Sequence, residues 1–248
     1  MNDIEITRAD GVLTIRLART QKKNALTSAM YDAMTAAFAD AQRDADVGAI
    51  VIRGGDGVFT AGNDIQDFIA AAQAPGEMAA LRFIEALAAL ETPLVAAIEG
   101  VAVGIGSTLM LHCDLVYAAP DARFHMPFVD LGLVPEAGSS LLLPRRVGMA
   151  RASEILLLGE AFDAEAAQRL GLVNAIVPAA DLYAHAQSRA AALAKKPRAA
   201  LAATRRLLRG DGAELRAHMR LEAEAFAKAL RSGEAQKAFV AFMTRSKA

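Results

Sequence analysis

The feature that most limits the fold of this chain is a succession of short, almost wholly apolar runs with helix-like stretches between them. The runs span 49–53, 94–98 and 115–118, and glycines follow the first two. Such runs are typical of strands buried on both faces, as in a parallel sheet covered by helices. A helix-like stretch at 106–112 separates the last two runs. Strands that alternate with helices predict the α/β class.

The N-terminal part continues this pattern. Two β-rich runs within 4–17 flank Ala9-Asp10-Gly11, which predicts a hairpin, and 122–125 is a further short extended piece. Thr27 is a favourable N-cap for a helix. The apolar face of that helix has near-four spacing: Met30, Met34, Phe38 and Ala41.

The character of the chain changes from about Ala180, where strand-like runs cease. Pro197 and the break at 210–212 divide the remainder into three predicted helices. One of them carries an apolar stripe: Leu215, Met219, Ala223, Phe226 and Leu230. This stripe must pack either on the body of the same chain or on another subunit. We therefore divide the chain into a core, 1–190, and a helical region, 191–248.

Composition excludes several classes of function. The chain has 248 residues, with 27 Lys and Arg against 28 Asp and Glu, so a dedicated nucleic-acid binder is not expected. The single cysteine, Cys113, excludes an internal disulfide, and the four histidines have no metal-ligand spacing. The most apolar stretch, 94–111, is interrupted by Glu99 and glycines, and the N-terminus lacks the features of a secretory signal. We expect a cytoplasmic protein without a metal or a membrane partner.

Two segments rich in small residues, 59–64 and 99–107, each precede a helix-like stretch. Small side chains let a ligand approach the backbone, and the start of a helix has unpaired N–H groups. Two such groups could bind one oxygen, as in an oxyanion hole, although glycines at strand ends also serve simply as turns. A dinucleotide-binding GxGxxG motif is excluded, because Leu109 stands where its third glycine would be.

Glu136 is the candidate acid–base residue. After Pro135 it could simply occupy the first turn of a helix, where an acidic residue is favourable. Alternatively, its neighbours Val134 and Ala137 could place it in an apolar pocket. Desolvation would then raise its pKa and suit it to transferring protons.

In the order of its segments the chain resembles the crotonase superfamily, the enoyl-CoA hydratases and isomerases. The matching stretches are Lys23–Leu26, 59–68, 99–114, 124–144, 164–177 and 241–242. The resemblance implies a ClpP-like spiral of ββα repeats with a C-terminal helical trimerisation region, hence a homotrimer or a dimer of trimers. It also implies an acyl-CoA substrate, with no cofactor beyond the coenzyme A that the substrate carries.

The resemblance also assigns roles to residues. It places the two amides of an oxyanion hole at Asn63 and Ile105, and a backbone contact with adenine at Ala61. Three basic residues are candidate partners of the CoA phosphates, or else belong to an ordinary solvated loop: Arg19, Lys22 and Lys23. Three apolar residues are candidates either for the acyl pocket or for the core: Phe68, Ile84 and Phe128.

The departures from the family pattern bear on the reaction. The two glutamates of the hydratases correspond to Thr108 and Phe128 here, and neither can transfer a proton to or from water. Glu136, in contrast, stands where the Δ3,Δ2-enoyl-CoA isomerases carry their single acid. We therefore expect an isomerase in which Glu136 moves a proton from C2 to C4. A hydratase, another acyl-CoA enzyme of this fold and a non-catalytic acyl-CoA-binding protein are the alternatives.

Overall fold

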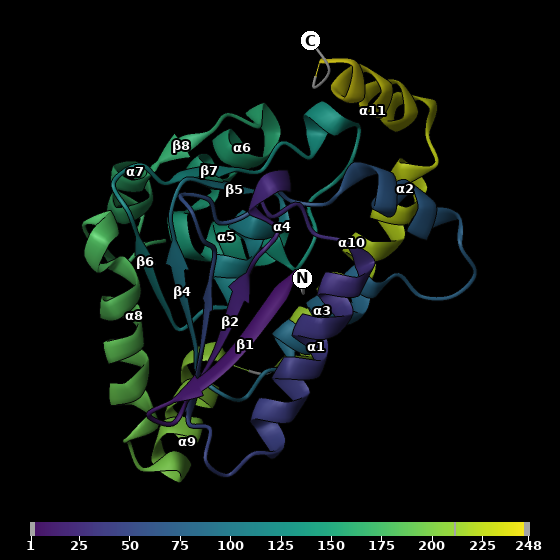
Figure 1. Ribbon diagram of the computed structural model, residues 1–248. Coiled ribbons are helices and arrows are strands. Elements are labelled where there is room, and N and C mark those ends of the chain that lie inside the picture. Colours follow the sequence, from purple (N-terminus) through teal and green to yellow (C-terminus); the bar gives the residue numbers. More distant parts are fainter. Residues whose placement is uncertain (1–2, 211, 246–248) are drawn as a thin grey trace.

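A computed structural model describes residues 3–210 and 212–245 and contains two sheets (Figure 1). The larger sheet has the strand order β1-β2-β3-β4-β6-β9, and the smaller has the order β5-β7-β8. In the larger sheet only β1 is antiparallel to its neighbour. The strands are β1 (Ile4–Ala9), β2 (Val12–Leu17), β3 (Ala49–Arg53), β4 (Leu94–Ile98), β5 (Val101–Val103), β6 (Leu115–Ala118), β7 (Arg123–His125), β8 (Phe162–Asp163) and β9 (Ala175–Ile176). The predicted α/β class is confirmed.

The N-terminal hairpin forms as predicted, with β1 and β2 paired from Ala9 and Val12 outward. Asp10 and Gly11 adopt φ angles of 53° and 74°. Two positive φ angles in a two-residue turn match the right-handed twist of the flanking strands. Aspartate and glycine are the residue types that tolerate this conformation.

Helices cover both faces of the larger sheet (Figure 1). Ile50 and Ile52 of β3 belong to the core formed with α1 (Ser28–Arg43) and α3 (Ala79–Ala88). Val51, between them, belongs to a second core formed with α8 (Ala179–Ala194). Because alternate residues of a strand point to opposite faces and both faces are covered here, residues 49–52 of β3 are all apolar and buried.

The predicted N-cap of α1 is confirmed, since Thr27 accepts a hydrogen bond from the amide of Met30. The stripe predicted for this helix is buried. The remaining helices and single turns are η1 (Thr20–Lys22), α2 (Ile65–Gln73), α4 (Ile105–Thr108), η2 (Leu109–His112), η3 (Val129–Leu131), α5 (Ser139–Val147), α6 (Met149–Leu158), α7 (Ala164–Arg169), α9 (Arg198–Arg209), α10 (Gly212–Leu230) and α11 (Gly233–Arg245).

The C-terminal region differs in part from expectation. Breaks at Pro197 and Gly210 occur as predicted, but Ser232 begins a further helix, α11, by accepting a hydrogen bond from the amide of Ala235. The boundary predicted after residue 190 falls within α8, which packs on the sheet as one helix. None of the described helices is long and apolar enough to span a membrane.

The apolar stripe of α10 packs on the body of its own chain. Met219 is buried, and Phe226 makes an edge-to-face contact with Phe68 of α2, with ring centroids 6.1 Å apart. This is one of the two alternatives that the sequence left open. In contrast, Leu207 and Leu208 of α9 are largely exposed, and the predicted oligomer stays a prediction.

Candidate active site

Two segments that follow strands of the larger sheet lie side by side. Thr60 forms a parallel bridge with Ala102. The Thr60 amide donates to the Val101 carbonyl at 2.9 Å, and the Thr60 carbonyl accepts from the Val103 amide at 3.0 Å. Asn63 and Ile105 each follow the bridge by three residues. The register therefore brings the two predicted oxyanion-hole residues to neighbouring positions.

Glycine permits this close approach. A Cβ atom on Gly106 would lie 2.5 Å from Cγ2 of Thr60, and one on Gly62 would lie 3.0 Å from the carbonyl oxygen of Val103. The small residues of both segments thus act as more than turns, because a larger side chain at either glycine would separate the segments.

The amides of Asn63 and Ile105 are unpaired within the part of the chain that the structure describes. Neither has a hydrogen-bond acceptor among residues 3–210 and 212–245. Ile105 is the first residue of α4, where an amide has no partner within its helix. Two unpaired N–H groups on adjacent segments can donate to one oxygen atom.

An N-terminal loop fixes the segment that carries Asn63. The Leu26 amide donates to the Gly62 carbonyl and the Asp64 amide donates to the Leu26 carbonyl, both at 2.8 Å. The buried Asn24 donates from Nδ2 to the Phe59 carbonyl at 3.0 Å. The motif at 23–26 thus has a positioning role that its sequence alone did not reveal.

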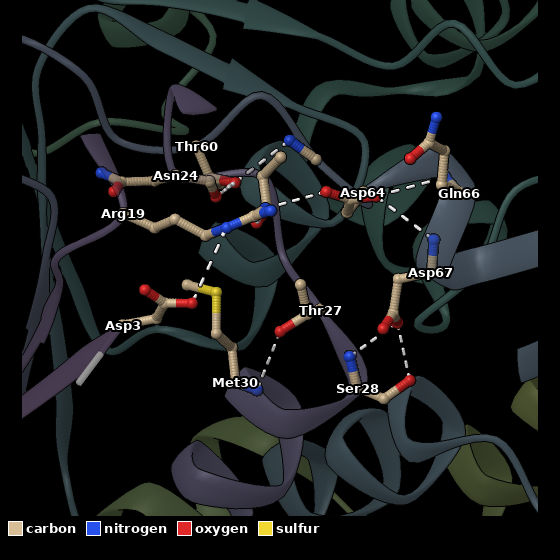
Figure 2. Close-up of polar contacts among 12 residues, drawn as sticks. Asp3, Arg19, Asn24, Thr27, Ser28, Met30, Thr60, Asp64, Gln66 and Asp67 are labelled. Carbon is tan, nitrogen blue, oxygen red and sulfur yellow. Dashed lines mark hydrogen bonds and ion pairs between the residues drawn. The ribbon is translucent and has the colours of Figure 1, made fainter. Parts of the chain in front are cut away.

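Figure 2 shows Arg19 between Asp3 and Asp64 in this loop. Its guanidinium lies 2.9 Å from Oδ2 of Asp64 and 3.7 Å from Oδ2 of Asp3. Asp64 also caps α2, and its hydrogen bond and ion pair with Arg19 lower the pKa of its carboxyl despite the opposing effect of burial. Arg19 is therefore engaged in a structural network, whereas Lys22 and Lys23 are exposed.

Glu136 lies in a segment without regular secondary structure that precedes α5, which begins at Ser139. The interpretation of Pro135 and Glu136 as a first helical turn is therefore wrong, because Ala137 and Gly138 form a turn with positive φ angles before the helix. The half-buried Glu136 accepts a hydrogen bond of 2.6 Å from Oγ1 of Thr108. Thr108 is three residues beyond Ile105 in the same short helix, α4, so Glu136 is hydrogen-bonded to the helix whose first residue carries the unpaired Ile105 amide.

Burial raises the pKa of Glu136 to about 8, and the negative charge of Glu222 adds to this rise, whereas the hydrogen bond from Thr108 opposes it. A carboxyl group with a pKa near neutrality can both accept and donate a proton at physiological pH. This is the environment that the apolar-pocket interpretation predicted.

A buried histidine stabilises the turn after Glu136. Ala137 has a φ of 57°, which is unfavourable for a residue with a side chain. Its carbonyl oxygen lies 2.7 Å from Nε2 of the buried His112. Burial lowers the pKa of His112 to about 4, so the neutral ring donates its Nε2 proton to this carbonyl.

A cavity of about 790 Å³ adjoins Glu136 and Asn63, which both line it. Of the three candidates for the acyl pocket or the core, Phe68 and Ile84 line the cavity, while Phe128 is buried and is not part of the wall. Most of the wall is apolar and comes from α2, α3, α10 and α11. Its main apolar members are Phe68, Ile69, Met78, Leu81, Ile84, Met219, Phe226, Leu230, Phe239 and Val240. Ala61, Arg19, Lys22, Lys23 and Ile105 do not line it.

Sequence reasoning missed Tyr31, a residue of the buried face of α1 that also lines the cavity. Its hydroxyl donates to Oδ1 of Asn63 at 2.5 Å. Burial and the negative charges of Glu136 and Asp67 raise the pKa of Tyr31 well above its usual value, so the phenol remains a donor. A tyrosine within the stripe of an amphipathic helix gives no sign of this role.

Cys113 is buried, and burial raises its pKa to about 12. No three His, Cys, Asp or Glu side chains of the described residues gather to hold a metal ion.

Comparison with known proteins identifies the family. The family model for enoyl-CoA hydratase/isomerase matches residues 7–248. A probable enoyl-CoA hydratase of Mycobacterium leprae is 39% identical over 201 residues, which cover 77% of this chain and 74% of that protein. Enoyl-CoA delta isomerase 2 of Rattus norvegicus is 34% identical over 250 residues, 98% of this chain and 63% of that protein.

Solved structures agree with these sequence matches. The structure of Pseudomonas aeruginosa OdaA has a TM-score of 0.94 and 44% identity, covering 98% of this chain and 99% of that one. An enoyl-CoA hydratase/isomerase from Pseudoalteromonas atlantica has the same TM-score at 36% identity and covers 98% of both chains. The crotonase fold predicted from the order of motifs is confirmed. The chain therefore belongs to the enoyl-CoA hydratase/isomerase family of acyl-CoA enzymes.

Proposed function

We propose that this enzyme moves the double bond of a 3-enoyl-CoA to the 2-trans position. One observation carries the proposal: Glu136, whose pKa burial raises to about 8, lines the cavity and is hydrogen-bonded to α4, and the segments beside it carry two unpaired amides, Asn63 and Ile105. A shift of one proton along an allylic system needs one group that both accepts and donates.

The mechanism uses these groups in two steps. Glu136 as carboxylate removes a proton from C2, and the electrons of the C–H bond move toward the thioester oxygen to give a dienolate. The amides of Asn63 and Ile105 donate to this oxygen, where negative charge develops. Glu136 then returns the proton to C4, and the double bond forms between C2 and C3. Glu136 ends ionised, ready for another turnover.

The coenzyme A part of the substrate would lie outside the cavity. The exposed Lys22 and Lys23 are suited to its phosphates, and the backbone at Ala61 to its adenine. Arg19 would support this loop through Asp64, although it could also contact a phosphate. No further cofactor takes part in the proposed reaction, because the proton returns to the carbon chain and no electrons are exchanged.

Hydration of a 2-enoyl-CoA is the second candidate, because several similar proteins are named probable enoyl-CoA hydratases. Hydration by two carboxylates has no support at Thr108, whose hydroxyl is bonded to Glu136, or at Phe128, which is buried in the core. The name of the rat relative, in contrast, supports an isomerase.

The test is product analysis with purified enzyme and trans-3-decenoyl-CoA. We expect trans-2-decenoyl-CoA from the wild type and a rate lower by at least about a thousandfold from Glu136→Gln, as is usual for loss of an acid–base group. Glu224→Gln, an exposed substitution on α10, serves as the matched control. Formation of 3-hydroxydecanoyl-CoA from the 2-enoyl thioester, with no isomerisation, would replace the proposal by a hydratase.

A further inference from the structure

A second carboxylate reaches the active site from the C-terminal helix α10. Glu222 is 7% exposed and accepts hydrogen bonds from the amides of Gly138 and Ser140, at 2.6 and 2.9 Å. The Ser140 hydroxyl donates to the same carboxylate at 2.5 Å. These donors belong to the start of α5, where Gly138 has no side chain to act as a cap. Glu222 thus supplies the cap from 82 residues away in the sequence.

The capped turn is the one that follows Glu136. The Glu136 carbonyl accepts from the amide and hydroxyl of Ser139, at 3.0 and 2.6 Å. Glu222 binds the residues on either side of Ser139. The buried His112 donates to the carbonyl of the strained Ala137 in the same turn. The backbone of Glu136 is therefore fixed between the core and α10, while its side chain is fixed by Thr108.

We propose that Glu222 is a positioning residue of the active site, which binds the first turn of α5 from α10 and thereby fixes the carboxyl of Glu136 against the cavity. This inference rests on the proposed role of Glu136. It gives the C-terminal region a function within its own chain: α10 closes the cavity with Met219 and Phe226, and Glu222 joins the same helix to the catalytic turn.

The charge of Glu222 has a second effect. It lines the same cavity as Glu136, and its negative charge helps to raise the pKa of that carboxyl. Among the described residues, Thr108 of α4 also acts on Glu136 and favours the carboxylate, and the neutral Tyr31 of α1 lines the same cavity. The other charged side chains of the cavity wall are Arg216 and Arg220 of α10, Arg231 at its end, Glu77, and Glu85 of α3. On α10, His218 lies 3.8 Å from Glu222 and its Nε2 lies 2.7 Å from the Ser140 hydroxyl. Because that hydroxyl donates to Glu222, His218 is the donor in this pair.

Glu222→Gln tests both effects. Glutamine keeps the size of the side chain but loses the charge, and its amide nitrogen cannot accept from a backbone N–H. We expect kcat for trans-3-decenoyl-CoA to fall about tenfold, with a smaller change in KM, because the turn loses a charged acceptor. We also expect the acid limb of the kcat/KM profile to move to lower pH, since a neighbouring negative charge is gone.

A readout independent of turnover separates this inference from the proposed reaction. Infrared titration can follow the carboxyl band that disappears in Glu136→Gln. In Glu222→Gln this band should titrate at lower pH than in the wild type, even if 3-enoyl-CoA proves not to be the substrate. Glu224→Gln removes the same charge from the exposed side of α10 and should move neither the band nor the limb.

Glu222→Asp separates position from charge. Aspartate keeps the charge but is one methylene shorter, so kcat should fall while the acid limb stays near that of the wild type. If Glu222→Gln does not fold, Glu222→Asp still tests whether the position of this carboxylate affects kcat. A folded Glu222→Gln with the wild-type kcat and the wild-type titration of Glu136 would overturn the proposal, as would a Glu222→Asp variant with the wild-type kcat.

Discussion

The raised pKa of Glu136 predicts that removal of this carboxyl stabilises the protein at alkaline pH. The unfolded chain exposes Glu136 to water, where its pKa is near 4.5, whereas burial in the folded chain raises it to about 8. Glu136→Gln keeps the size of the side chain and an oxygen that can accept from Thr108, but it cannot ionise. The variant therefore isolates the free energy of holding a carboxylate in this cavity wall.

The sign and size follow from proton linkage. Between pH 4.5 and pH 8 the folded state binds more protons at Glu136 than the unfolded state, so wild-type stability falls as pH rises through this window. The difference between the two pKa values corresponds to about 5 kcal/mol in the free energy of unfolding, reached in full above pH 8. Near pH 7 the cost is about 3 kcal/mol. Below pH 4.5 both states are protonated and the cost vanishes.

Urea denaturation of wild type and Glu136→Gln at pH 5 and pH 9, at one protein concentration, measures this difference. We expect similar midpoints at pH 5 and a clearly higher midpoint for the variant at pH 9, with unchanged slopes. Glu224→Gln, exposed on α10, controls for the general loss of a negative charge. Equal stabilities of wild type and Glu136→Gln at pH 9 would refute the assignment of a buried, destabilised carboxylate.

Three further predictions concern activity. The kcat/KM of the wild type should rise with pH and reach a plateau above pH 8. Thr108→Val should move this rise to higher pH, because the hydrogen bond that it removes favours the carboxylate of Glu136. If the rise stays at the same pH, Glu136 is not the base. Tyr31→Phe should lower kcat about tenfold in steady-state assays, because it removes the hydrogen bond to the side chain of Asn63. A wild-type kcat would mean that the segment carrying Asn63 keeps its position without Tyr31. Across 3-enoyl-CoA probes of six to ten carbons, kcat/KM should rise about fourfold per methylene, since each added methylene is buried against the apolar wall of the cavity. If kcat/KM does not depend on acyl length, the acyl chain binds outside this cavity.

Local signals in the sequence predicted those parts of the fold that depend on neighbouring residues. The apolar runs at 49–53 and 94–98 became the central strands, and Thr27 capped the helix expected after it. The turn at Asp10 and Gly11 also follows from residue type. In each case a local requirement restricts the residue types: burial on both faces requires apolar residues, a helix N-cap favours threonine, and a positive φ angle favours aspartate and glycine.

The parts that could not be predicted depend on contacts between distant residues. Tyr31 reads as a core residue of an amphipathic helix, and only the fold brings its hydroxyl to Asn63. Glu222 reads as one of several charges on α10, and its partners lie more than 80 residues away. Of the two interpretations of the segment at Pro135, the first helical turn is wrong: a proline favours such a turn locally, but Ala137 and Gly138 adopt a turn with positive φ angles and α5 begins only at Ser139.

The neighbours of Glu136 are consistent with a site that works with one acid. A lone carboxyl that must take a proton and return it functions best when its pKa lies near the working pH. A glutamate at position 108 would place a second negative charge beside Glu136 and raise its pKa further, which would disfavour the base form. The Thr108 hydroxyl supplies a hydrogen bond without charge and so favours the carboxylate against the desolvation that burial imposes. The charge of Glu222, which is bound to the amides of Gly138 and Ser140, adds to the rise that burial causes, so the pKa of Glu136 results mainly from burial, opposed by Thr108. The residue that replaces the hydratase acid is thus itself part of the proposed isomerase site.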